Sequence, residues 1–158
     1  MGYSAAMFSD HFWSRFSMSL GRSGLRLAGK MNIPVYRATR GRVWGKVGKA
    51  PVLLLTSTGR RSGQQRVAPV VYLADGANVI VIGSNAGNKN EPGWSFNLKA
   101  NPDAHVEIGA EHRDVRARVA EGEERERLWK AMNVQYSGFD DYEAKTSRDI
   151  AVFVLEPR

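Results

Sequence analysis

The chain has 158 residues, of which 42% are apolar, and its formal net charge is +7 at pH 7. This length and composition suit one domain with a single hydrophobic core. The absence of cysteine excludes disulfide bonds, thiolate metal ligands and thiol nucleophiles.

The positive charge is concentrated near the start of the chain. Residues 1–50 contain nine Lys and Arg against one acidic residue, Asp10, whereas residues 51–158 contain fourteen basic and fifteen acidic residues. A nucleic-acid-binding domain more often spreads its basic groups over a folded face, so we expect no nucleic-acid partner. We expect a basic leader at 1–49 and a neutral domain at 50–158.

The leader begins with the pattern of an amphipathic helix, in which apolar residues recur at steps of four: Phe8, Phe12, Phe16 and Leu20. Either this helix packs on its own domain, or residues 5–30 contact the inner face of the cell membrane. No stretch reaches the roughly 20 apolar residues of a membrane-spanning helix, and a signal-peptide order is missing, so we expect a cytoplasmic protein. Residues 32–50 show no stable period, which predicts a connector.

Strand patterns follow from Pro51. "VLLLTST" leads to "RVAPVVYLAD", a turn at Asp75–Gly76 and "NVIVIGSN", which predicts three antiparallel strands. Pro69 interrupts the second strand and indicates an edge position or a bulge, because proline cannot donate to the ladder. Pro92 can begin a short helix that ends at Asn101–Pro102.

The second half continues with "AHVEIG" and "RDVRARVAEG", a helix from about Glu121 to Tyr136, and the apolar strand "IAVFVLEP". This gives roughly six strands without the strand–helix alternation that a parallel sheet requires. The order favours a mainly β fold, a small antiparallel barrel with peripheral helices.

Three arginines surround the turn between the first two strands. Arg60 and Arg61 stand between Gly59 and Gly63, and Arg66 follows on the outgoing strand. We expect both glycines to be free to adopt positive φ. The guanidinium groups can hold phosphate or carboxylate through paired hydrogen bonds. The alternative is a solvated hairpin tip, and the missing lysine–hydroxyl pair excludes a Walker loop.

A second loop, "GSNAGNKNEPGW", joins a strand end to the helix at Pro92. Free amides in the first turn of that helix can stabilise negative charge on a carbonyl or ring nitrogen. The alternative is an ordinary connecting loop. Together the two loops offer one end for a charged tail and one for a polar aromatic head.

These motifs, with "PGWSFNLKANPDAHVEI" and "YSGFDDYEAKTSRDIAVFVLEP", resemble the deazaflavin-dependent nitroreductases and F420H2-dependent quinone reductases over roughly residues 50–157. The resemblance implies a split β-barrel related to the FMN-binding pyridoxamine-phosphate-oxidase group. It also implies coenzyme F420, a deazaflavin with a phosphate-linked oligoglutamate tail, as the reductant; FMN is the less favoured cofactor.

The resemblance further implies which residues contact the coenzyme. The tail would lie among residues of the hairpin: Ser57, Arg60, Arg61, Ser62 and Arg66. The ring would lie along Ala68 and Pro69, beside two groups at the second loop and the helix start: Ser84, Asn85, Ala86 and Gly87, then Pro92, Gly93 and Trp94. Asn85 stands where a lysine can occur in the family, which removes one tail-binding charge.

The acceptor pocket of the family matches Tyr136, Phe139 and Tyr142, and Tyr136 and Tyr142 are the candidates for catalysis. Phe139 lacks a hydroxyl that some members have, so we expect a quinone or another flat, electron-poor acceptor rather than a nitroimidazole. The alternative is that these rings pack in the core or rim. Four further aromatics are predicted to be core: Tyr72, Trp94, Trp129 and Phe153.

His11, His105 and His112 lie far apart in sequence with no carboxylate at ligand spacing, so we predict no metal site. Two other functions remain open. The protein could be a non-catalytic carrier of F420, a flavin or haem, or a membrane-surface module that acts through its basic leader. Related barrels often dimerise, so a homodimer is a further expectation.

Overall fold

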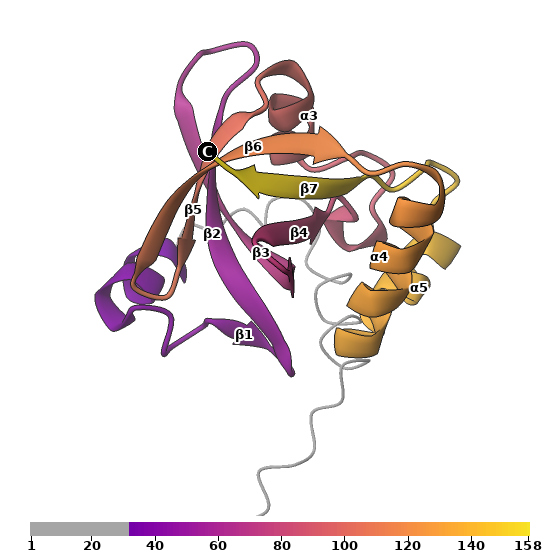
Figure 1. Ribbon diagram of the computed structural model, residues 1–158, viewed down its shortest axis with the longest axis horizontal. Helices are drawn as coiled ribbons and strands as arrows, with labels where there is room; N and C mark the ends of the chain where they lie inside the picture. The colour runs from indigo at the N-terminus through magenta and orange to yellow at the C-terminus, as the bar shows by residue number, and fades with distance from the viewer. Residues whose placement is uncertain (1–31) are drawn as a thin grey trace, which may run out of the picture.

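The computed structural model describes residues 32–158, which form an antiparallel barrel flanked by helices (Figure 1). A helical segment covers residues 32–39. The strands are β1 Lys46–Val47, β2 Ala50–Thr58, β3 Gln65–Asp75, β4 Asn78–Ile82, β5 Asp103–Ile108, β6 Glu111–Val119 and β7 Val152–Pro157. The helices are the 3-10 turn η1 Asn85–Gly87, α3 Gly93–Ala100, α4 Gly122–Gln135 and α5 Gly138–Ala144. The predicted amphipathic helix of the leader lies outside the described residues.

The sheet closes on itself. Its strand order is β1-β2-β3-β4-β7-β6-β5, β5 pairs back onto β2, and every pair is antiparallel. Each strand predicted from residue 51 onward is present. The predicted antiparallel barrel is therefore confirmed, and the short β1 pairs with the first residues of β2.

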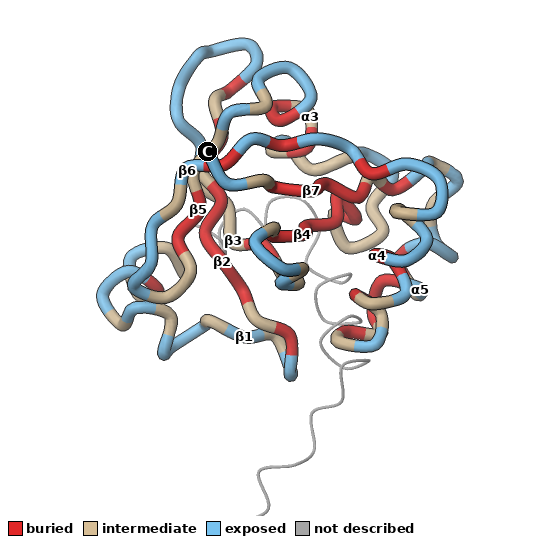
Figure 2. Tube along the Cα trace, in the orientation of Figure 1, coloured by how far each residue is buried: buried red, intermediate tan, exposed pale blue. Residues whose placement is uncertain are grey.

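Two hydrophobic clusters stabilise the barrel, one on each face of β4 and β7. In β4, Val79 and Val81 belong to the cluster shared with β2, β5, β6 and α3, whereas Ile80 and Ile82 belong to the cluster that α4 and α5 cover. This alternation is the two-residue period of a strand. Figure 2 shows β2, β4 and β7 largely buried and the hairpin tips exposed. Complete burial of one such side chain contributes about 1.5–3 kcal/mol.

Residues 32–49, predicted as a connector, contain the helix at 32–39 and the short strand β1, and they contact the barrel. The Tyr36 side chain is buried, and its hydroxyl donates to the Val52 carbonyl (3.0 Å) and accepts the Gly109 N–H (2.9 Å). Beside it, Arg37 forms an ion pair with Glu107 (2.6 Å). These anchors come from distant strands, which local periodicity cannot reveal.

The barrel is split along part of β3. That strand pairs with β2 from Gln65 to Val71 but with β4 only from Tyr72 to Asp75. Pro69 lies opposite Leu54 in a continuous register, in the part of β3 with a single neighbour. Its edge position is therefore confirmed, and no bulge is needed.

Candidate functional site

The turn between β2 and β3 is a tight hairpin, and its two glycines are required for different reasons. The Gly59 N–H donates to the Gln64 carbonyl (2.8 Å), and the Gly63 N–H donates to the Gly59 carbonyl (2.8 Å). Gly63 has φ +67°, as expected. Gly59 does not have positive φ, which corrects the prediction for that residue. A Cβ there would lie 2.7 Å from Ser62 Oγ, so close approach explains this glycine.

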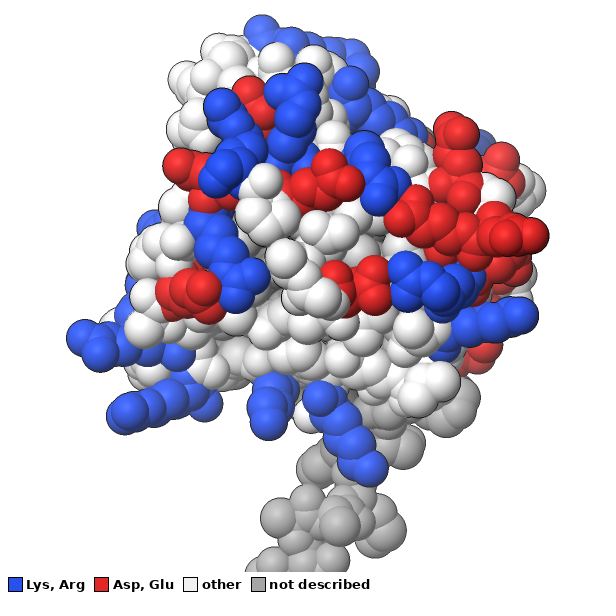
Figure 3. Space-filling view, viewed as in Figure 1, with Lys and Arg blue, Asp and Glu red and all other residues white. Residues whose placement is uncertain are grey.

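Arg60, Arg61 and Arg66 are exposed on this hairpin, and none forms an ion pair with another residue of the described part of the chain. Arg66 is the register partner of Ser57, so the outgoing strand returns beside β2 as predicted. The Arg60 guanidinium lies 4.5 Å from the centre of the Phe96 ring. In Figure 3, basic side chains line the upper edge of the molecule, the end where this hairpin lies in Figure 1.

A buried amide fixes the base of the hairpin to α3. Asn97 accepts the Arg60 N–H at Oδ1 (3.1 Å), and its Nδ2 donates to Ser57 Oγ (3.1 Å). Ser57 and Asn97 are both buried, so satisfied hydrogen bonds matter here. Sequence reasoning missed Asn97, whose single signal was an amide between the apolar neighbours Phe96 and Leu98.

The second predicted loop contains three consecutive residues in the left-handed region: Asn85 (φ 47°), Ala86 (φ 53°) and Gly87 (φ 73°). This conformation is unfavourable by about 1–2 kcal/mol for a residue such as alanine. A Cβ on Gly87 would lie 3.1 Å from the Tyr142 Cα, so this loop packs directly on α5. Such strain persists only where the surroundings hold it, and it is concentrated at functional sites.

Arg148 is the group that holds residues 83–88, and sequence reasoning missed it. Its Nη2 donates to the carbonyls of Gly83 (3.0 Å) and Ser84 (2.8 Å), and its Nε donates to Asn88 (3.3 Å). Burial lowers the pKa of Arg148, while the negative charge of Glu91 acts in the opposite direction. An arginine ten residues before the chain end gave no local signal of this contact.

Glu91 closes the loop at the start of α3. It accepts hydrogen bonds from Ser95 Oγ (2.6 Å) and Lys99 Nζ (2.7 Å). Burial tends to raise the pKa of Glu91, but the hydrogen bonds from Lys99 and Ser95 outweigh it and the pKa is lowered. Pro92 is the residue before the helix, and Gly93 at the helix start is exposed with open space where a Cβ would be.

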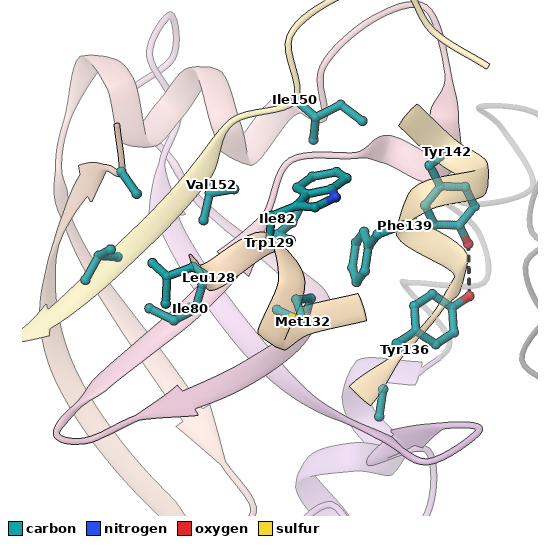
Figure 4. Close-up of a cluster of buried hydrophobic side chains, with 13 residues drawn as sticks. Ile80, Ile82, Leu128, Trp129, Met132, Tyr136, Phe139, Tyr142, Ile150 and Val152 are labelled. Atoms are coloured by element: carbon teal, nitrogen blue, oxygen red, sulfur yellow. Dashed lines mark hydrogen bonds between the residues drawn. The ribbon is translucent and has the colours of Figure 1, made fainter. Parts of the chain in front are cut away.

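The late aromatic residues form a packed cluster (Figure 4). Tyr136, Phe139 and Tyr142 are buried, and their rings are 5.4–5.9 Å apart in edge-to-face contacts around Phe139. The Tyr136 and Tyr142 hydroxyls are hydrogen-bonded to each other at 3.0 Å. This arrangement agrees with the packing interpretation. Of the four aromatics predicted as core, Trp129 and Phe153 are buried and Tyr72 and Trp94 are partly buried.

Helix α3 links the predicted site residues. Its Asn97 contacts the hairpin, and a Cβ on Gly83 would lie 3.2 Å from Ser95 Oγ, so the same helix also packs on the second loop. Ala68 and Pro69 are partly buried on the single-neighbour part of β3. Helix α3 therefore contacts both the hairpin and the start of the second predicted loop.

Two of the histidines meet on neighbouring strands. His105 Nε2 lies 3.3 Å from His112 Nδ1, and His105 Nδ1 lies 2.9 Å from Asp114 Oδ1. The β5–β6 hairpin explains this contact, which sequence distance concealed. Within residues 32–158, no group of three or more His, Cys, Asp or Glu is placed to hold a metal ion.

Several known proteins are similar to this chain in sequence and in fold. The sequence model described as F420H(2)-dependent quinone reductase matches residues 29–157. A Mycobacterium tuberculosis protein, named provisionally for that activity, is 45% identical over 108 residues, covering 68% of this chain and 91% of that protein. A solved F420-H2 dependent reductase, FDR-A, is 38% identical with a TM-score of 0.63, covering 67% of this chain and 94% of that one. Another solved structure, described as a domain-swapped dimer, is 34% identical with a TM-score of 0.65, covering 80% and 95%.

Proposed function

Because this chain belongs to the F420H(2)-dependent quinone reductase family, as its motifs indicated, we propose that it transfers a hydride from reduced coenzyme F420 to a quinone. One observation carries the proposal. Three exposed arginines without acidic partners stand on a hairpin that α3 ties to a strained, rigidly held loop.

The hairpin fits the anionic tail of F420. Arg60, Arg61 and Arg66 can each donate paired hydrogen bonds to phosphate or carboxylate oxygens. The Ser62 hydroxyl accepts the Gln64 N–H and steadies the turn (3.3 Å). Ser57 is buried and bonded to Asn97, so we propose that it supports the hairpin from below.

The ring would lie between the single-neighbour part of β3, at Ala68 and Pro69, and residues 84–87. Pro92, Gly93 and Trp94 would border it at the start of α3, where open space lies over Gly93. When bound, the reduced coenzyme supplies the hydride. The residues of the chain would align the two reactants and provide fixed dipoles.

The acceptor would approach from the side of α5. We propose that Tyr136, Phe139 and Tyr142 form its aromatic wall, and that the Tyr136–Tyr142 hydroxyl pair donates one proton to the oxyanion that hydride transfer leaves on the acceptor and regains it from water. Figure 4 shows these two hydroxyls meeting at the edge of the cluster, on the far side of Phe139 from Leu128 and Ile80. Gly87 packs against Tyr142, so this edge adjoins the proposed ring loop.

Binding and turnover test the proposal separately. F420 and FMN are titrated side by side by fluorescence quenching, and F420 is expected to bind more tightly because FMN lacks the oligoglutamate tail. Oxidation of reduced F420 is then followed with menadione as the acceptor. Tight binding without oxidation by any quinone tested would favour the carrier alternative.

A membrane-surface contact is a second candidate property. The proposed segment, residues 5–30, lies outside the described part of the chain, but the turn after residue 39 has a matching surface. Trp44 is 47% exposed there, among exposed cations and no acidic residue between 38 and 50: Arg40, Arg42, Lys46 and Lys49. Within residues 32–158, no helix is long and apolar enough to cross a membrane. Co-sedimentation with anionic and zwitterionic liposomes, with and without Trp44→Ala, tests the contact.

A homodimer remains a prediction. It is supported by the relative that was solved as a domain-swapped dimer. Sedimentation velocity at several protein concentrations would measure the oligomeric state directly. A single species at the monomer mass across the range would contradict it.

A further inference from the structure

The Arg148 side chain holds residues 83–88 through hydrogen bonds and forms no ion pair with a described residue. Arg148, between α5 and β7, directs Nε and Nη2 to three carbonyl oxygens of this loop. Its Nη1 is buried and has no hydrogen-bond partner. Unpaired buried donors are rare in folded proteins, so a guanidinium kept in this state calls for an explanation.

The nearest acidic group does not neutralise this charge. Glu91 already accepts hydrogen bonds from Ser95 (2.6 Å) and Lys99 (2.7 and 2.9 Å). Among residues 32–158, no carboxylate oxygen lies within 4.0 Å of the Arg148 guanidinium. The three carbonyl groups orient the guanidinium through their dipoles but carry no net charge.

The position of the charge follows from the same contacts. The carbonyls of Gly83, Ser84 and Asn88 accept hydrogen bonds from Arg148, which is itself half-buried, so the cation lies in direct contact with the backbone of this loop. A charge that is partly shielded from water is felt over a longer distance than an exposed one, because the effective dielectric around it is low. A ligand resting on this loop would therefore experience a fixed positive potential.

We propose that Arg148 is an electrostatic positioning residue, whose charge against the backbone of residues 83–88 favours the negatively charged form of the ring bound there. The inference rests on the proposed function. Coenzyme F420 carries a ring hydroxyl, and its ionisation spreads negative charge across the ring system as far as the pyrimidine carbonyls. A nearby fixed cation stabilises that form and lowers the pKa of the bound ring.

The test is a pH titration of the bound coenzyme by its visible absorbance, with free coenzyme as reference. In the wild-type protein the bound ring is expected to ionise at lower pH than the free ring. Arg148→Gln retains an amide donor for the loop but removes the charge. Its ionisation constant for the bound ring is expected to fall about tenfold, equal to about 1.4 kcal/mol. Arg148→Lys retains the charge and should titrate close to wild type.

Lys145→Gln is the matched control. It removes an exposed positive charge at the end of α5, in the same region as Gly87. Water screens such a charge, so the titration is expected to stay within twofold of wild type. Thermal unfolding of each variant tests whether the protein remains folded.

The outcomes separate this inference from the proposed function. If F420 fluorescence is not quenched by the wild-type protein, the proposed function fails. If the coenzyme binds and titrates at the same pH in wild type and Arg148→Gln, only the role of Arg148 is overturned. An equal shift in Arg148→Gln and Arg148→Lys also overturns it, because a loosened loop, and not the charge, would then set the ionisation.

Discussion

Arginine is used differently at the hairpin and on the surface formed by β5, β6 and α4. The surface arginines are paired with acids at 2.7–2.9 Å: Arg113 with Glu111, Arg116 with Asp103, Arg118 with Glu124, and Arg127 with Asp75. The hairpin arginines have no acidic partner among the described residues. Exposed ion pairs contribute only about 0–1 kcal/mol to stability. The hairpin arginines are therefore available for an anion, and we propose that they hold the coenzyme tail.

Figure 3 shows the same contrast across one face. Basic and acidic side chains are interspersed over its middle, and acidic residues gather on the right, where α4 lies in Figure 1. A net charge of +7 says little about this arrangement.

The largest expected effect is loss of tail binding in the double variant Arg61→Ala/Arg66→Ala. Each charge-assisted hydrogen bond to an anion contributes about 1.5–3 kcal/mol. Removing both arginines should raise the Kd for F420 about 100-fold or more, measured by fluorescence quenching. The matched control is Arg116→Ala/Arg118→Ala, which removes two paired arginines and should leave the Kd within about twofold. A similar rise of the Kd in both double variants would contradict the proposed difference between unpaired and paired arginines.

The next effect concerns the support below the hairpin. Asn97→Ala removes the acceptor of the Arg60 N–H and the donor to Ser57 Oγ, and it leaves buried polar groups unsatisfied. We expect the free energy of unfolding to fall by about 1–3 kcal/mol and the Kd for F420 to rise about tenfold, because the hairpin loses its fixed position. Urea denaturation and fluorescence quenching measure the two quantities.

Ser57→Ala is the comparison variant for Asn97→Ala. Ser57→Ala removes one of the two hydrogen bonds and leaves the Arg60 contact in place. Its effects should be smaller than those of Asn97→Ala in both measurements. An unchanged Kd for F420 in Asn97→Ala would show that the hairpin is positioned without α3.

A smaller effect is expected at the acceptor side. Tyr142→Phe removes one member of the hydroxyl pair with Tyr136 but keeps the ring that packs on Phe139. A general acid contributes about 10²–10⁴-fold when it acts directly. With two hydroxyls able to serve, we expect kcat with menadione to fall about tenfold while the Kd for F420 is unchanged. An unchanged kcat would support the packing interpretation alone.

The sequence was sufficient to predict the barrel because each strand and turn has a local sequence pattern. Alternation in β4 and β7, the Asp75–Gly76 turn and Pro69 on the single-neighbour stretch each depend on a few adjacent residues. The hairpin arginines were found in the same way. Arg148, Asn97 and Tyr36 were missed because each acts on a segment distant in sequence. Such contacts depend on tertiary structure, and no local period records them.

The smallest expected effect is on the pH dependence of the Tm, and it tests the ion pair between Arg37 and Glu107. Glu107 is buried, and the hydrogen bond from Arg37 is the main reason that its pKa lies below the ordinary value of 4.5. A carboxyl whose pKa is lower in the folded state stabilises the fold fully above its unfolded pKa, and this stabilisation is lost as the pH falls through the folded pKa. Glu107→Gln should therefore lower the Tm at pH 7 and make it less sensitive to pH below 4.5, while the Kd for F420 at pH 7 stays unchanged. Thermal unfolding from pH 7 to pH 3 measures the Tm. A Kd for F420 that rose as much as is expected for the hairpin variants would show that the paired arginines also contribute to ligand binding.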